Sequence, residues 1–395
     1  MNHPILGSLA LGYAPLIDPQ RVVNATRLSV VPLRPDLQPD AGDLLAAIGE
    51  VWPADGSAQL VLSIRHEELL KGVLAAVASP RLMVEVPAFM AADPALADTL
   101  RGLKSRGQVL LLKGIPSQPL DPAVKACFKS AVLDLDEEPR AAQVALPRLV
   151  SGLRGAAAVD GAFKRGAQGV IGWPVEGGYD APVTDTPGRR NEVQADLQVI
   201  VELMSRVDQG DDVDRLEQTL KRDPSLAFKL LRYMNSAAFG LSVEVSSFRH
   251  ALMLLGYSRL KRWLALLLTT ASKDHTMRPV MYGALRRGLM MEELGKSMDD
   301  AEMRDEMFVC GLFSLLDHML KQPFARLLQS IPVPERVRQA LVDETGPYQP
   351  YLELVRALEA ESIYDYRSAT EQLMLGASEV NSCLLNALSK ATHLE

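Results

Sequence analysis

The 395-residue sequence has little cysteine and no excess of positive charge. Its three cysteines, Cys127, Cys310 and Cys383, are far apart and form no Cys-x-x-Cys pair. We therefore expect neither a disulfide framework nor a cysteine zinc site, and we predict a reducing, cytoplasmic compartment. The formal net charge is −7, and neither half of the chain has the excess of lysine and arginine that neutralises nucleic-acid phosphates. We therefore expect no nucleic-acid partner.

Long apolar runs are also absent. The run at 263–270 is flanked by Arg262 and Lys273, so it is much shorter than the roughly 20 residues that a membrane-spanning helix needs. The start of the chain has no basic segment before its apolar stretch, and we predict no signal peptide and no membrane partner. Phosphate-binding glycine loops and the GxSxG and HExxH motifs are missing as well, which removes the usual sequence evidence for several enzyme classes.

The first 175 residues alternate between short β-favouring runs and amphipathic helical segments. The predicted strands are 11–17, 21–33, 59–64, 81–86, 108–113, 130–135, 142–146 and 169–173. The first two are joined by a turn that is too short for a crossover, so they should form an antiparallel hairpin. The later strands alternate with helices and should be parallel, with right-handed crossovers. Together these strands are enough to close a barrel.

The composition and the periodicity of the sequence change in the second half of the chain. Residues 176–192 are rich in proline, glycine and charged residues and lack periodicity, so we interpret them as a linker between domains at 1–175 and 193–395. After residue 193 the apolar residues follow the helical period. The predicted helices include 223–235, 248–256, 258–273, 280–298, 303–321, 334–343, 351–362 and 366–391. The predicted fold class is an α/β domain followed by an all-α domain.

One segment of the helical half, 223–267, resembles the signature of the HDOD family. Its family-like positions include Asn235, Ser236, Gly240, Leu255 and Gly256. The resemblance spans about 190–345 and implies an all-helical domain related to the HD metal phosphohydrolases. We interpret the Asn-Ser pair as a structural helix end rather than a ligand contact, because such residues commonly satisfy backbone groups there.

The same resemblance indicates that the metal site has been lost. In related HD domains one helix reads GLLHDIG, and here 311–317 reads GLFSLLD. Ser314 stands at the histidine position and Leu315 at the aspartate position, and leucine cannot bind a metal. Asp317 and His318 follow directly, but in reversed order and displaced along the helix. We interpret them as a helix-surface pair, because a metal site needs several converging ligands.

The first half is similar to the EAL family, the barrel that hydrolyses cyclic di-GMP. Residues 13–18 resemble the family's opening YQPIVD, 81–87 its "lxlEitE" strand and 167–174 its "QGyxfgxP" ending. The resemblance covers about 5–180 and implies a TIM-like barrel whose chemistry depends on carboxylates that hold two metal ions.

The carboxylates of that chemistry are largely missing here. Thr26 stands where the Glu of the Glu-Ala-Leu triplet belongs, and Lys113 and Gly114 replace two metal carboxylates. Glu85 remains as an isolated strand carboxylate, which we predict to be a satisfied core or rim group. The acidic residues within 134–138 follow a strand, and we interpret them as a solvated loop because charge runs are usually exposed.

Both halves therefore resemble enzyme families without keeping the enzymes' metal ligands, and we expect no metal, no cofactor and no catalysis. The leading hypothesis is a bacterial signalling protein that acts through a protein partner or a second copy of the chain. A second hypothesis is a receptor for cyclic di-GMP or another nucleotide, with Arg27, Lys113 or Arg148 facing the phosphates and Glu85 beside them.

A third hypothesis is a residual metal-dependent phosphohydrolase in the helical domain. It requires Ser314, Asp317, His318 and His250 to converge within metal-ligand distance. The sequence leaves the partner and the oligomeric state open.

Overall fold

The computed structural model describes residues 3–34, 39–52, 59–77, 81–175, 189–220, 248–270, 274–298, 300–329 and 331–392. The chain forms two compact units. The first comprises residues 1–177 together with 356–385, and the second comprises 178–355 together with 386–395. Residues 356–385, which lie within the predicted helical domain, thus belong to the unit that contains the N-terminal residues. Helix α7 begins at Arg189, inside the range predicted as a linker.

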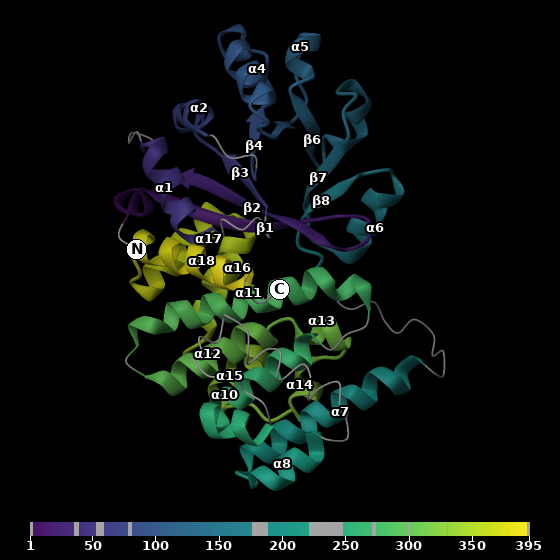
Figure 1. Cartoon of the computed structure of the whole chain (residues 1–395), viewed down its shortest axis with the longest axis vertical. Coiled ribbons are helices and arrows are strands. Elements are labelled where there is room, and N and C mark those ends of the chain that lie inside the picture. Colours follow the sequence, from purple (N-terminus) through teal and green to yellow (C-terminus); the bar gives the residue numbers. More distant parts are fainter. Residues whose placement is uncertain are drawn as a thin grey trace. The chain divides into compact units, whose positions relative to one another are not determined.

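The first unit is built on a closed barrel of eight strands in the order β1 to β8 (Figure 1). The strands are β1 (Leu9–Ile17), β2 (Val23–Pro32), β3 (Leu60–Ile64), β4 (Leu82–Pro87), β5 (Leu110–Lys113), β6 (Phe128–Asp134), β7 (Arg148–Leu153) and β8 (Gly169–Gly172). Strand β1 is antiparallel to both β2 and β8, and all the other neighbours are parallel. The predicted hairpin, parallel strands and barrel closure are confirmed.

One predicted strand is wrong. Residues 142–146 do not pair in the sheet, because Glu138–Gln143 form the 3-10 helix η3 and Ala145 has a positive φ of 49°. Strand β7 begins only after Pro147, whose carbonyl accepts a hydrogen bond from the Ala131 N–H at 2.8 Å. A short apolar run does not by itself distinguish a strand from a buried helical turn.

The inside of the barrel is filled by one apolar layer to which each strand contributes a residue. Its members are Ala14, Ala25, Val61, Met83, Leu111, Val132, Leu149 and Ile171, all of them buried. Side chains alternate along a strand, so residues two positions from this layer also face the barrel interior. That geometry places a second ring of side chains near the C-terminal ends of the parallel strands.

Helices cover the outside of the barrel (Figure 1). They are α1 (Ala41–Val51), α2 (Glu67–Ala76), α3 (Ala88–Ala91), α4 (Ala97–Ser105), α5 (Pro122–Lys125) and α6 (Ala156–Lys164), with the 3-10 helices η1 (Pro4–Ser8) and η2 (Pro94–Leu96). In α2 the side chain of His66 caps the first turn, and Leu69, Leu70 and Val73 form the buried stripe. This is the usual pattern of a helix that crosses between parallel strands.

Residues 356–385 complete the first unit. They belong to α16 (Gln349–Ala360), α17 (Ile363–Leu373) and α18 (Ala377–Thr392). The fully buried side-chain amide of Asn381 donates to the carbonyls of Leu6 and Leu9 at 2.7 Å and accepts from the Leu11 N–H at 3.1 Å. The single helix predicted at 366–391 is therefore two helices, because Met374 adopts a left-handed conformation that ends α17.

The described residues of the second unit form helices and connecting turns, with no strand among them. Its helices are α7 (Arg189–Asp208), α8 (Val213–Leu220), α10 (Phe248–Thr270), α11 (Arg278–Leu294), α12 (Ala301–Phe313), α13 (Leu316–Leu320), α14 (Phe324–Leu327) and α15 (Glu335–Arg338). Helix α10 is kinked at Gly256, with φ 70° and ψ 175°, between the helices predicted at 248–256 and 258–273. Glycine tolerates this backbone because it has no Cβ. In the ranges that the structure describes, every helix is too short or too polar to cross a bilayer.

Candidate functional site

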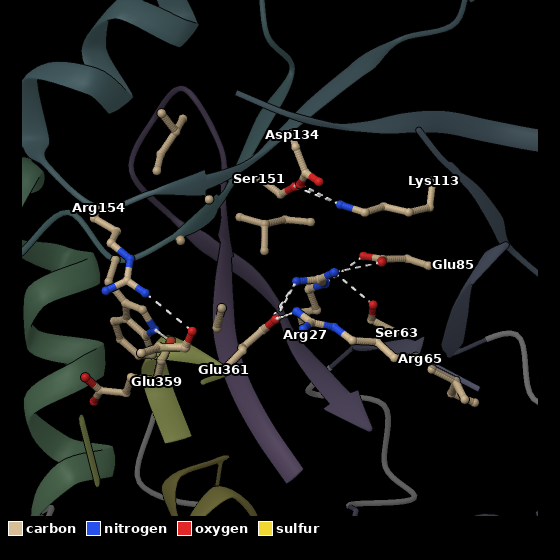
Figure 2. A pocket seen from close by; sticks show the side chains of 18 of the residues that line it. Arg27, Ser63, Arg65, Glu85, Lys113, Asp134, Ser151, Arg154, Glu359 and Glu361 are labelled. Atoms are coloured by element: carbon tan, nitrogen blue, oxygen red, sulfur yellow. Dashed lines mark hydrogen bonds and ion pairs between the residues drawn. The ribbon is translucent and has the colours of Figure 1, made fainter. Parts of the chain in front are cut away.

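A ring of mostly polar side chains lies at the C-terminal ends of the parallel strands. Each stands two residues after a member of the apolar layer and therefore faces the barrel interior. The ring consists of Arg27, Ser63, Glu85, Lys113, Asp134, Ser151 and Trp173, and it lines a cavity of about 500 Å³ (Figure 2). We call this cavity the barrel mouth. Ligand sites of parallel barrels are found at this end of the strands.

Arg27 is bonded to carboxylates on two sides (Figure 2). Its Nε and Nη2 donate to the two oxygens of Glu85 at 2.8 and 2.9 Å, and Nη2 also donates to Ser63 Oγ at 2.8 Å. Its Nη1 donates to both oxygens of Glu361 at 3.1 Å. Burial lowers the pKa of Arg27, but the carboxylates of Glu85 and Glu361 raise it by more than burial lowers it. The net pKa lies above its ordinary value, so the guanidinium stays positively charged. The structure thus brings Arg27 and Glu85 together, and Glu85, 2% exposed, is a satisfied core group.

Lys113 forms the second charge pair of the barrel mouth. Its Nζ lies 2.7 Å from Asp134 Oδ1 and 3.1 Å from Ser151 Oγ. Burial raises the pKa of Asp134, but hydrogen bonds from Lys113 and Ser151 lower it more, so the carboxyl titrates below its usual range. Gly114 follows with a positive φ of 84° and does not line the cavity.

The last residues of α16 and the turn that follows it, together residues 359–361, supply the remaining wall of the barrel mouth. Glu361 ends the helix in the left-handed region, at φ 52°, and also accepts from Arg65 Nη2 at 3.1 Å. The carboxylate of Glu359 accepts from the Tyr13 hydroxyl at 3.2 Å, and its backbone carbonyl accepts from Trp173 Nε1 at 3.1 Å. Sequence reasoning missed this turn, because the chain separates Glu361 from Arg27 by 334 residues and Glu359 from Trp173 by 186.

The charges that line the barrel mouth are balanced only when this turn is included. The barrel part contributes four cations and two carboxylates, namely Arg27, Arg65, Lys113, Arg154, Glu85 and Asp134. Glu359 and Glu361 then make carboxylates and cations equal in number. Without the turn, the barrel mouth would carry an excess of positive charge.

Three sequence-based assignments in the barrel need correction. Thr26 is buried but does not line the barrel mouth, because strand alternation turns Arg27 inward instead. Arg148 starts β7, at the opposite end of that strand, where it donates to the carbonyl of Arg165, so it does not face the mouth. The acidic run is not uniformly solvated: Glu138 is 6% exposed and accepts from Arg165 Nε at 3.0 Å, while Asp134 lines the mouth.

In the second unit, Ser314, which is predicted to stand at the HD histidine position, is bonded within the protein. Ser314 caps the end of α12, and its hydroxyl donates to the Gly311 carbonyl at 2.7 Å. The same hydroxyl accepts from Nη1 of buried Arg287 at 3.0 Å. Leu315 is 2% exposed. An arginine therefore lies beside the serine that the sequence predicts at the histidine position.

Asp317 and His318 lie together on α13. Asp317 Oδ2 is 3.9 Å from His318 Nε2, and Oδ1 accepts from the His318 N–H at 2.8 Å. Burial raises the pKa of Asp317, although the neighbouring His318 opposes the shift. In the part of the chain that the structure describes, no group of three or more His, Cys, Asp or Glu side chains could hold a metal ion.

Several predicted residues of the helical half lie outside the described residues. They are Asn235, Ser236 and Gly240, together with the side chains of His250 and Leu255. Of the HDOD-like positions, Gly256 is described, and its positive φ produces the kink in α10. The convergence of His250 with Ser314, Asp317 and His318, which the hypothesis of a residual phosphohydrolase requires, therefore stays untested.

Residues 195–322 match the HDOD domain family. The chain contains an HDOD domain. Together with the closed barrel, this match confirms the predicted order of an N-terminal barrel and a helical region with an HDOD domain.

Two curated proteins are similar to parts of the chain. The uncharacterized protein YuxH of Bacillus subtilis is 29% identical over 180 residues, which cover 45% of this chain and 43% of YuxH. The cyclic di-GMP phosphodiesterase CdgJ of Vibrio cholerae is 28% identical over 148 residues, which cover 38% of this chain and 34% of CdgJ. The matches thus span less than half the length of either relative.

Similar solved structures include two determined with cyclic di-GMP and calcium. Klebsiella pneumoniae BlrP1 has a TM-score of 0.31 and 9% identity, over 45% of this chain and 57% of that one. The Bacillus subtilis YkuI protein, which has an EAL domain, has a TM-score of 0.30 and 13% identity, over 63% of this chain and 73% of that one.

Proposed function

We propose that this protein is a non-catalytic signalling protein that acts through binding surfaces of its two units. The observation that supports the proposal is the Arg27 guanidinium, which is bonded to Glu85 on one side and to Glu361 on the other. A two-metal hydrolytic site needs carboxylates that share their charge with divalent ions. In the barrel mouth the carboxylates are instead neutralised by arginine and lysine side chains of the protein itself.

The electrostatic cost of adding a metal to this arrangement is large. At an effective dielectric constant of about 20, a divalent ion about 4 Å from a guanidinium is repelled by on the order of 8 kcal/mol. Asp134 offers no independent site, because it is paired with Lys113 at 2.7 Å. The cations would have to leave before metal ions could bind the carboxylates.

The second unit supports the same proposal. At the HD metal position, Ser314 is bonded to Arg287 and Leu315 offers no donor atom. A cation therefore stands beside the lost ligand position in both units. Interaction surfaces would then carry the function, with another protein or a second copy of the chain as the partner.

Metal analysis and hydrolysis assays test the absence of catalysis. The full chain is purified with Mg²⁺ and Mn²⁺, its metal content is measured, and it is incubated with cyclic di-GMP and a phosphomonoester. We expect less than stoichiometric metal and no turnover above that of a control without protein. Stoichiometric metal together with turnover that Glu85→Gln or Asp317→Asn abolishes would overturn the proposal.

Affinity capture from the native host tests the interaction role, with light scattering to measure the oligomeric state of the pure protein. We expect a saturable, reproducible partner or a defined oligomer whose formation survives EDTA. A monomer that captures no partner above a mock control would count against this part of the proposal.

A second candidate function, metal-free nucleotide binding, is favoured by the four cations that the barrel contributes to the mouth. Arginine forks match phosphate geometry through two parallel hydrogen bonds. Calorimetric titration with cyclic di-GMP in EDTA tests it. Heat that disappears in Arg65→Gln would support binding in the mouth, whereas no heat at high micromolar nucleotide would remove this candidate.

A further inference from the structure

We propose that the turn at 359–361 is a built-in competitor for an anionic ligand of the barrel mouth. In this proposal the Glu361 carboxylate occupies a subsite formed by Arg27 and Arg65, and a small phosphate-bearing anion takes that subsite when the turn leaves. The proposal concerns a site and its control. It does not depend on whether the protein has a protein partner.

The two carboxylates on Arg27 are not equivalent. Glu85 belongs to β4, is 2% exposed, and is held in the barrel wall. The Glu361 side chain is 10% exposed and belongs to a turn between two helices. Its carboxylate accepts hydrogen bonds from Nη1 of Arg27 and Nη2 of Arg65, each at 3.1 Å. Guanidinium groups bind phosphate and carboxylate oxygens with the same fork geometry, so these donors suit either anion.

The backbone of Glu361 indicates why this turn can be displaced. Its φ of 52° is left-handed, a conformation that is unfavourable for a non-glycine residue and persists when tertiary contacts impose it. The contacts with Arg27 and Arg65 offset that cost while the turn is seated. An anion that satisfied both arginines would remove the reason for Glu361 to keep the conformation.

The barrel is shaped to admit the turn. Gly12 of β1 lies two residues before Ala14 of the apolar layer, in the strand that runs opposite to its neighbours. A Cβ at Gly12 would lie 2.8 Å from the Leu358 carbonyl, 3.2 Å from Glu361 Cγ and 2.7 Å from Ser29 Oγ. Any side chain at this position would crowd the turn without changing a charge of the mouth.

Other contacts anchor residues 356–385 away from the mouth. Asn381 is bonded to backbone groups of Leu6, Leu9 and Leu11, and Arg367 donates to the Leu33 carbonyl at 2.7 Å. For the turn at 359–361 to leave, Glu359 must also give up its bonds with Tyr13 and Trp173, and the Ala360 carbonyl its bond from Arg154. The rest of the segment stays docked on the barrel through Asn381 and Arg367.

Calorimetric titration of the full chain with pyrophosphate, in EDTA and at low salt, tests the competition. We expect Glu361→Gln to bind pyrophosphate at least tenfold more tightly than the natural sequence. Glu361→Gly should behave in the same way, because glycine keeps the left-handed turn and removes the carboxylate. The matched control is Glu371→Gln, an exposed position on α17 with the same change of charge, and it should bind like the natural sequence.

A second set of variants tests whether pyrophosphate binds at the subsite formed by Arg27 and Arg65. Gly12→Ala should also tighten pyrophosphate binding, and it should speed hydrogen exchange at 359–365. Adding Arg65→Gln to Glu361→Gln should remove most of the gain. Affinity that is unchanged by the Glu361 substitutions, an absence of binding in every variant, or a gain that survives Arg65→Gln would each overturn the proposal.

Hydrogen exchange in the natural sequence provides a test if the variants fail to fold. Saturating pyrophosphate should increase exchange at 359–365 and leave the amides around Asn381 protected. Unchanged exchange at the turn would overturn the proposal. None of these measurements uses hydrolysis or a protein partner, so their failure is distinguishable from failure of the proposed function.

Discussion

Replacing Arg27 with methionine should strongly destabilise the first unit. The change removes the hydrogen bonds that Arg27 donates to Glu85, Ser63 and Glu361. Glu85 is 2% exposed, so its carboxylate would be left buried without its cation. Glu361 keeps Arg65 and lies nearer the surface. Removing one partner of a buried ion pair costs about 3–5 kcal/mol, and we expect a loss of about 4 kcal/mol, mostly from Glu85.

Urea unfolding followed by tryptophan fluorescence measures this loss. Trp173 lines the barrel mouth, and its ring packs edge-to-face on Tyr13 with centroids 5.3 Å apart. Its signal reports on the first unit when Trp52 and Trp263 are changed to phenylalanine in the reference protein. With a urea slope of about 2–3 kcal/mol per molar, the midpoint should fall by roughly 1.5 M.

Two further variants separate the ion pair from the general effect of mutation. Arg27→Met combined with Glu85→Leu should recover at least half of the loss, because replacing both members of a buried pair with apolar side chains is often nearly neutral. Lys71→Met removes an exposed pair with Glu67 and Glu68 on α2 and should leave the urea midpoint almost unchanged, because solvent screens exposed pairs. An Arg27→Met midpoint equal to that of Lys71→Met would refute the reasoning.

Three other substitutions have defined outcomes. Asn381→Leu should lower the free energy of unfolding in urea by about 2–3 kcal/mol, because the buried backbone groups of Leu6, Leu9 and Leu11 lose their partner. Ser382→Ala is the control. An equal loss of stability in both variants would contradict the role of the Asn381 amide. Asp134 has a pKa below its usual range, so its ionised form stabilises the fold above about pH 4, and this contribution is lost as pH falls through the folded-state pKa. Asp134→Asn should therefore flatten the acid loss of stability below about pH 5, by only a fraction of a kcal/mol because the side chain is 58% exposed; an unchanged acid profile would contradict the pairing. Asp317 has a raised pKa, so its carboxylate disfavours the fold at neutral pH, and Asp317→Asn should raise thermal stability at pH 7 by on the order of 1 kcal/mol and have no effect below about pH 3. A fall in stability that depends on Mn²⁺ would instead indicate a metal site.

The barrel could be predicted because its sequence pattern is local. Short apolar runs alternate with amphipathic helices, and the brief turn between the first two runs permits only a hairpin. The error at 142–146 arose because four apolar residues fit either a strand or a helical turn, and Ala145 with its positive φ was not foreseeable from composition. The break at Met374 was missed for the same reason, because a left-handed methionine carries no clear sequence signal.

The barrel mouth could be predicted only in part. Glu85 and Lys113 are conspicuous because they interrupt apolar strands. Family resemblance assigned Thr26 to the functional position, but the alternation from Ala25 in the apolar layer selects Arg27. That signal was available in the sequence. The contact of Glu361 with Arg27 and Arg65 was not, because it depends on how a distant helical segment docks on the barrel.

The first unit is interrupted along the chain, and this affects the order in which it forms during synthesis. Residues 1–177 are made first, and 356–385 join the same unit only after the intervening 178–355 have been translated. At about 5–20 residues per second, that interval lasts roughly 10–35 s. During it, the nascent barrel lacks Asn381 on β1 and Glu361 at Arg27. A barrel that closes within this interval therefore has its cationic cavity open to cellular anions until residues 356–385 dock.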